Sequence, residues 1–183
     1  IQLVGKVIED LSEFDESLIG LDPKKCIFRI NRDIRFSKDK TPYKTNFGAL
    51  IGAQGKKTET TGFYLHLAPG QNFGGGGIYK PAPEALAAIR QEIDYNPDGL
   101  NKILENPTFK DTFGEIQGDQ LKTAPKGYPK DHPNIELLRY KSYYVIHQFD
   151  DEAMNDGSFY ADLIRNYKTA SGFNDYLKTA IAG

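Results

Sequence analysis

The stretch from Arg29 to Lys44, RINRDIRFSKDKTPYK, concentrates the side chains that are best suited to bind an anion. It contains three arginines and three lysines but only two aspartates. The whole chain has 23 basic and 25 acidic residues, so this positive charge is local. Guanidinium and ammonium groups bind phosphate and carboxylate, and hydroxyl donors assist them. The stretch therefore predicts recognition of an anionic group.

The candidate ligand-binding residues of this stretch are five cations and one phenol: Arg29, Arg32, Arg35, Lys40, Tyr43 and Lys44. Alternation at a period of two predicts a strand over residues 26–34, with Arg29, Asp33 and Arg35 on its polar face. Arg32 has the parity of the apolar residues of that strand. A guanidinium of that parity requires a carboxylate partner, a bound anion, or a position at a bulge of the strand. Arg32 is therefore either a structural brace or part of a site, and both alternatives stay open.

Two further segments add candidates. The segment GGGGIYKP (74–81) allows a ligand or a neighbouring backbone to come close, which makes Gly76 and Tyr79 candidates for ligand binding. It lacks the residue order of a P-loop, and the glycines would equally accommodate large rings from neighbouring strands. The loop LKTAPKGYPKDHP (121–133) adds Lys122 and Lys126 on a backbone that its prolines stiffen.

No reaction follows from the sequence, and whether the protein is an enzyme stays open. Tyr43 and His132 are the candidate proton carriers, the latter because Asp131 precedes it. Adjacent residues rarely make that contact directly. The three histidines and the single Cys26 lack metal-ligand spacing, so we expect no metal site. No nucleotide-cofactor motif is present, and the cofactor is unknown.

Length and composition bound the protein class. A chain of 183 residues predicts a single domain over 1–183. A net charge of −2 counts against nucleic-acid or membrane-surface binding as the main role. Cys26 cannot form an internal disulfide, and we expect a buried, inert thiol in a cytoplasmic protein. No apolar run reaches the length of a membrane span. The oligomeric state is not indicated.

Periodicity predicts an α+β fold. Strands are predicted over 26–34, 46–53, 62–68, 73–80 and 141–149, and helices over 1–19, 83–93, 96–106, 107–116, 134–140, 158–169 and 171–181. Strands cluster early and helices late, and short loops join the early strands as in a meander. We therefore expect a mostly antiparallel sheet of about five strands, with helices packed on one side.

Three motifs in consistent order resemble a known family. They are FRINRDIRFSKDKTPYKTNFGA, then GGGGIYKP, then FGEIQGDQLKTAPKGYPKDHPNIELLRYKS. Together they resemble the bacterial and fungal family called domain of unknown function 2461 over nearly the whole chain. The family's usual N-terminal segment, with an Asn-rich turn and a Trp-Phe pair, is absent, so we expect that residues upstream of Ile1 are missing. The resemblance implies no activity, substrate or cofactor.

These observations lead to three functional hypotheses. The first is a single cationic pocket for an anionic small molecule. It would be built from Arg29, Arg32, Arg35, Lys40 and Lys44, together with Tyr43, Tyr79 and Lys126. The second is a non-catalytic protein-interaction module in which arginine–aspartate ladders only brace the fold. The third is single-stranded nucleic-acid binding by stacking on tyrosines beside basic residues, which the net charge disfavours.

Overall fold

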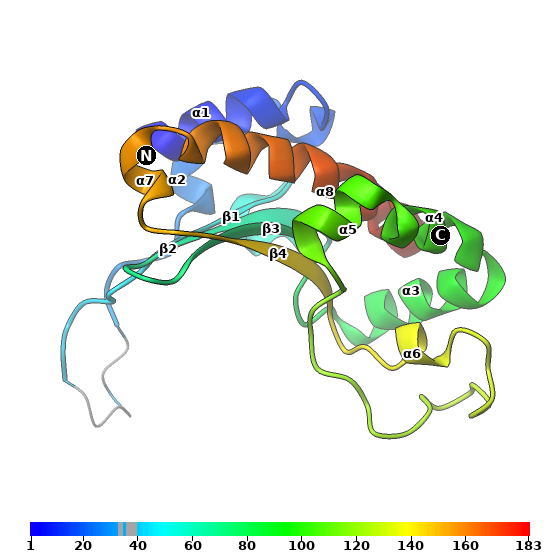
Figure 1. Cartoon of the computed structure of the whole chain (residues 1–183). Coiled ribbons are helices and arrows are strands. Elements are labelled where there is room, and N and C mark those ends of the chain that lie inside the picture. Colours follow the sequence, from blue (N-terminus) through cyan, green and yellow to red (C-terminus); the bar gives the residue numbers. More distant parts are fainter. Residues whose placement is uncertain (33–34, 36–39) are drawn as a thin grey trace.

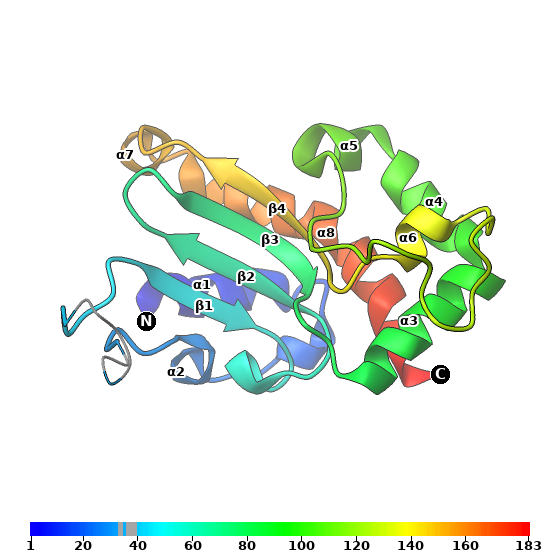
Figure 2. The ribbon, with the colours of Figure 1, turned by 90° about the horizontal axis from the view of Figure 1, so that it is seen from below.

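A four-stranded antiparallel sheet forms the centre of the part of the chain that the computed structural model describes, residues 1–32, 35 and 40–183. Its strands are β1 (Phe47–Ile51), β2 (Gly62–Leu67), β3 (Asn72–Ile78) and β4 (Tyr143–Phe149), in the spatial order β1-β2-β3-β4 (Figure 2). The first three strands follow one another as a meander, and the link from β3 to β4 carries most of the short helices. The α+β class and the antiparallel sheet are confirmed.

The helices lie over one face of the sheet and beyond one end of it (Figure 1). They are α1 (Gln2–Leu11), α2 (Pro23–Cys26), α3 (Pro83–Tyr95), α4 (Pro97–Glu105), α5 (Pro107–Phe113), α6 (Ile135–Leu138), α7 (Ala153–Asp156) and α8 (Phe159–Ala182), with 3-10 turns η1 (Glu16–Leu18) and η2 (Gly55–Lys57). The long α8 packs on β3 and also touches α1 and α3. Among the described helices, none is both long and apolar enough to cross a bilayer.

Helix α8 replaces the two C-terminal helices that the sequence predicts. Its buried residues Leu163, Tyr167, Ala170, Phe173 and Leu177 recur every three or four positions, so one face continues past Ser171 and Gly172. A glycine inside a helix costs about 1 kcal/mol relative to alanine. Burial of this continuous face offsets that cost. At the other end of the chain the helix predicted over 1–19 ends at Leu11, and a 3-10 turn follows.

The core lies between the sheet and α8. Ala49, Phe63, Leu65 and Val145 point to this side of their strands, and each is at most 1% exposed. The ring of Phe63 packs on that of Tyr167 with centroids 5.2 Å apart. The Tyr167 hydroxyl donates to the Tyr64 carbonyl at 3.0 Å, which fastens α8 to the backbone of β2. This face therefore holds the helices in place.

The expected fifth strand over residues 26–34 is not formed by the residues described there. Cys26 ends α2, and Ile27 makes one isolated bridge with Ala49. Beyond that bridge the chain leaves the sheet as a narrow ribbon, in which Asn31 bridges Tyr43 (Figure 1). We call the described residues 28–32, 35 and 40–44 of this ribbon the cationic arm.

Beyond Phe28, the described residues of the arm have no apolar face against the sheet. Ile30, which the alternation predicted to be buried, is 55% exposed. The parity that assigned Arg32 to a buried face therefore does not apply, because no sheet lies under this segment. The Arg32 backbone N–H donates to the Pro42 carbonyl at 2.9 Å, a contact within the arm. Asp33 of the expected Arg29–Asp33–Arg35 ladder lies outside the described residues.

Candidate functional site

The face of the sheet opposite α8 carries a groove of about 490 Å³. Figure 2 shows this face with the four strands in front and helices α1 and α8 behind them. We call this depression the aromatic groove. Its lining residues are Phe28, Leu50, Gly62, Tyr64, Phe73, Gly75, Gly76, Gly77, Tyr79, Tyr144, Val145 and Ile146.

Strand register explains why the groove exists. Tyr64 on β2, Gly75 on β3 and Ile146 on β4 lie side by side across the sheet. Because glycine has no side chain, a gap remains between the Tyr64 ring and the Ile146 side chain. In the next row Gly62 and Gly77 are neighbours, and Tyr144 follows on β4. Glycines at these neighbouring positions therefore form the floor of the groove.

The floor glycines are also required by the backbone. A Cβ built on Gly75 would lie 1.8 Å from the Val145 carbonyl oxygen. Gly77 has φ +127°, and its Cβ would lie 2.2 Å from the Tyr143 carbonyl oxygen. Gly76 has the opposite parity, and its Cβ would meet Asn174 Oδ1 at 3.0 Å on the α8 side. The predicted residue Gly76 thus allows α8 to lie close to β3, and only its backbone borders the groove.

Aromatic rings form the two walls. On the β2 side Tyr64 packs against Phe28 and Phe73, with ring centroids 6.3 and 5.8 Å away. On the other side Tyr79 and Tyr144 meet edge to face at 5.7 Å. Such walls favour a flat, apolar or aromatic body, because ring faces and edges both make favourable contacts with it. A concave site with apolar walls and few polar groups is the usual form of a small-molecule site.

One tyrosine–histidine pair lies at the margin of this wall. The Tyr64 hydroxyl and His66 Nδ1 are 3.4 Å apart, and the His66 ring stacks on Phe73 with centroids 4.6 Å apart. Burial raises the pKa of Tyr64 and lowers the pKa of His66. Both groups are therefore held in their neutral forms near neutral pH. They offer hydrogen bonds and no charge to a bound molecule.

Positive charge enters at the base of the cationic arm. A small recess of about 140 Å³ is lined by Arg29, Lys44, Asn46 and Gly48 together with Phe28 and Tyr64. Phe28 and Tyr64 also line the aromatic groove, so the recess and the groove adjoin. The Lys44 N–H donates to the Ile30 carbonyl at 2.8 Å, which sets the pairing of the two sides of the arm. Because the recess adjoins the groove, Arg29 and Lys44 lie beside the groove at its Phe28 and Tyr64 side.

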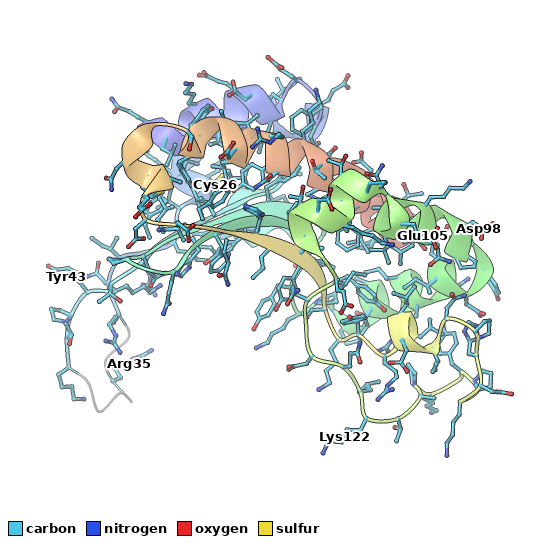
Figure 3. All side chains as sticks on the ribbon, viewed as in Figure 1. Cys26, Arg35, Tyr43, Asp98, Glu105 and Lys122 are labelled. Atoms are coloured by element: carbon cyan, nitrogen blue, oxygen red, sulfur yellow. The ribbon has the colours of Figure 1, made fainter. Side chains whose placement is uncertain are left out.

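The other predicted site residues are divided among separate regions. Tyr79 lies at the far wall of the groove and is 66% exposed. Tyr43 and Arg35 lie out along the arm, and Tyr43 is 57% exposed (Figure 3). Arg32 and Lys40 also belong to the arm and line none of the pockets described above.

Lys122 and Lys126 belong to the loop between α5 and α6. Figure 3 shows Lys122 on a different part of the molecule from Tyr43 and Arg35, below the sheet and the helices. Neither lysine lines the aromatic groove or the adjoining recess. The structure thus brings Arg29, Lys44 and Tyr79 to one face and leaves this loop outside.

His132 holds its own loop to α3. Its Nε2 lies 2.9 Å from Asp94 Oδ1, and the Asn134 backbone N–H donates to its Nδ1 at 3.0 Å. An Nδ1 that accepts a hydrogen bond carries no proton, so the proton is on Nε2 and is donated to Asp94. The expected partner, the adjacent Asp131, is therefore replaced by a carboxylate 38 residues away along the chain. Both ring nitrogens are engaged in positioning the loop.

Metal and thiol chemistry find no support in the described residues. Within them, no group of three or more His, Cys, Asp or Glu side chains is placed to hold a metal ion. Burial raises the pKa of the Cys26 thiol to about 11, so the thiolate nucleophile is scarce at neutral pH. The expectation of a buried, inert cysteine is met by a side chain with no exposed surface.

Sequence reasoning missed most of the aromatic side of the candidate site, with Tyr79 as the exception. Phe28, Tyr64, Phe73, Tyr144 and Ile146 line the groove, and none was singled out for binding. The available signal was that β2 and β4 carry large apolar or aromatic residues at both parities. Such strands need cover on two faces, whereas one face here has α8 and the other has the groove.

Comparisons with known proteins give a family but no activity. The sequence profile of a family described as conserved hypothetical protein (DUF2461) matches residues 1–176. Neither the curated proteins nor the solved structures contain a match to the chain. The geometry of the aromatic groove is therefore the basis for a functional proposal.

Proposed function

Because the chain belongs to the domain of unknown function 2461 family, whose name states no activity, we propose a function from its geometry. The protein binds a small molecule that combines a flat apolar or aromatic body with an anionic group. The body occupies the aromatic groove, and the anionic group lies in the recess beside Arg29 and Lys44. We further propose a cytoplasmic location, which the single unpaired cysteine supports.

The observation that carries this proposal is the contact between the two hollows. A groove with aromatic walls adjoins a recess with two cations, and Phe28 and Tyr64 belong to both. Apolar contacts in the groove provide affinity, whereas a charged group at one end fixes the orientation of the ligand. The volume of about 490 Å³ falls within the range of small-molecule sites.

Binding is a better-supported role than catalysis. The candidate Tyr43 lies out on the arm, and the candidate His132 is engaged by Asp94 and Asn134. Among the described groove residues, Tyr64 has a hydroxyl near His66 Nδ1, but burial keeps both groups neutral. The proposal therefore assigns no reaction to the groove.

A pair of matched dyes tests the proposal. Anilinonaphthalene sulfonate carries an aromatic body and one sulfonate, and phenylnaphthylamine has the same body without the charge. We expect the sulfonate to bind about tenfold more tightly than the neutral dye at low ionic strength, since a charge-assisted contact contributes about 1.5 kcal/mol or more. The preference should disappear in the variant Arg29→Gln/Lys44→Gln, while the affinity for the neutral dye stays the same. Equal binding of both dyes to the unmodified protein would refute the proposal that an anionic group binds in the recess.

A charge placed in the groove tests the proposal that the apolar body of the ligand binds there. Ile146→Glu puts a carboxylate opposite Gly75, and we expect it to abolish binding of both dyes. Gln148→Glu is the matched control, because it has the same strand and parity but does not line the groove. Dye binding that survives Ile146→Glu, or that both variants reduce equally, would contradict the groove as the site.

A second candidate has one observation in its favour. Aromatic rings on an uncovered sheet face beside a cationic arm also suit stacking of single-stranded nucleic acid. The net charge of −2 counts against it. Titration with a short oligonucleotide separates the two: a steep decrease in affinity with salt, together with weak dye binding, favours the nucleic-acid function.

A further inference from the structure

A second cationic hollow lies between α2 and η2, away from the aromatic groove. It has a volume of about 570 Å³ and is lined by Leu21, Lys24, Lys25, Ala53, Gln54, Lys56 and Lys57. Four of these seven residues are lysines, and none is acidic. We call this the lysine hollow. The sequence did not single it out, because its two Lys-Lys pairs lie about thirty residues apart in the chain.

The fold brings the two lysine pairs together through a tight contact. Gly55 begins η2 with φ +62°, and a Cβ there would lie 2.6 Å from the Lys25 carbonyl oxygen. Only glycine fits this conformation and this closeness without strain. The backbone contact places Lys56 and Lys57 next to Lys24 and Lys25. The cluster is therefore a consequence of the packing of α2 on η2.

The four lysines of the hollow take no part in the ion pairs formed by the described residues. The Lys56 ammonium donates to the Ile27 carbonyl at 2.9 Å, which fixes its position. Asp22 is the acidic residue nearest in sequence, and its Oδ1 accepts from the Lys24 backbone N–H at 2.9 Å. Four ammonium groups thus share one hollow and repel one another.

We propose that the lysine hollow binds a chain of at least two phosphate groups, as in a free oligophosphate or the phosphate tail of a nucleotide. Lysine is a common phosphate ligand, which it binds as a compact point charge with three donors. The hollow has four lysines and no arginine. Four positive charges exceed what one phosphate neutralises, so a ligand with several phosphates fits best. The lining also lacks aromatic rings on which a nucleic-acid base could stack.

Calorimetric titration of the whole protein at about 0.15 M ionic strength tests this proposal, with screening held constant. The probes are phosphate, pyrophosphate and tripolyphosphate. We expect affinity to rise in that order. The variant Lys25→Gln/Lys57→Gln should weaken tripolyphosphate binding about tenfold or more, because it removes two charge-assisted contacts to phosphate oxygens. Both residues are exposed, so the thermal midpoint should change little.

A matched control uses another lysine pair. Lys102 and Lys168 line a hollow of about 410 Å³ between α4, α5 and α8. Lys102→Gln/Lys168→Gln removes the same charge from the protein and should leave tripolyphosphate binding unchanged. An equal loss in both double variants means a response to net charge alone and overturns the proposal. Absence of saturable binding to the unmodified protein overturns it as well.

Two further arms identify the source of the phosphate chain and separate this site from the groove. Adenosine triphosphate that binds no better than tripolyphosphate indicates a free oligophosphate, and tighter binding indicates a nucleotide. An oligonucleotide that binds more tightly than either, and that the Lys25→Gln/Lys57→Gln variant releases, would replace the small ligand by a nucleic acid. The same variant should keep full affinity for the aromatic sulfonate dye. The proposals for the lysine hollow and for the aromatic groove can therefore be refuted independently.

Discussion

The two faces of this sheet use the same four strands in different ways. On the α8 side, Phe63, Leu65 and Val145 are buried against a continuous helix. On the other side, the large residues stand apart around Gly75 and Gly77 and leave a groove. The covered face therefore contributes most of the stability, and the open face is the one available to a ligand. In a sheet of this kind, function is best sought where large apolar residues lack cover.

The largest expected difference between the faces is in the cost of removing a phenylalanine ring. Phe63 is 1% exposed, and Phe63→Ala should lower the free energy of unfolding by about 3–5 kcal/mol. Phe73 is only partly buried at the groove, and Phe73→Ala should cost about 1 kcal/mol. Urea denaturation of both variants measures the difference. Equal costs would contradict the division of roles between the faces.

A smaller difference is expected for two tyrosine hydroxyls. Tyr167→Phe removes the bond from that hydroxyl to the Tyr64 carbonyl and should cost about 1 kcal/mol. Tyr144→Phe changes the groove wall and should stay within about 0.5 kcal/mol of the unmodified protein. The same denaturation measurement applies. A Tyr144→Phe variant that is the less stable of the two would show that the open face also holds the fold together.

The smallest effect is a dependence of stability on pH. Burial lowers the pKa of His66 in the folded protein, so below about pH 6.5, the ordinary value, the unfolded chain binds more protons than the folded one. Stability from this group is therefore present above that pH and is lost as the pH falls. Unfolding free energies of the unmodified protein and of His66→Gln, measured from pH 7.5 to 5, should diverge, with the shallower slope in the variant. Parallel curves would show that His66 does not contribute to the pH dependence of stability.

Local patterns in the sequence were sufficient to predict most elements of the fold. Alternating residues and glycine turns predicted β1, β2, β3 and β4 within a few residues, and proline starts marked α3, α4 and α5. Two long-range effects were not predictable from local patterns. The alternation of residues 26–34 does not lead to a regular strand, because its described residues make only the isolated bridges of Ile27 with Ala49 and of Asn31 with Tyr43. The break predicted at residue 170 does not end α8, because tertiary burial continues through it.

The sequence pointed to the cations of the candidate site and to one of its aromatic rings. Arg29, Lys44 and Tyr79 were singled out from charge and residue type, and all three border the groove or its recess. The aromatic walls depend on which residues meet across strands, for example Tyr64, Gly75 and Ile146, and register cannot be read from a single strand. The lysine hollow was hidden for the same reason, because Gly55 brings together segments that are distant in sequence.

The central claim is that the open face of the sheet binds the apolar, anionic ligand, and amide chemical shifts test it most directly. The protein labelled with ¹⁵N is titrated with the aromatic sulfonate dye and its spectrum is followed to saturation. We expect saturable shifts at Gly75, Gly77, Ile146 and Lys44, in the groove and its recess. Shifts that centre instead on Lys102, Phe109 and Gly172, in the hollow between α4, α5 and α8, would contradict it.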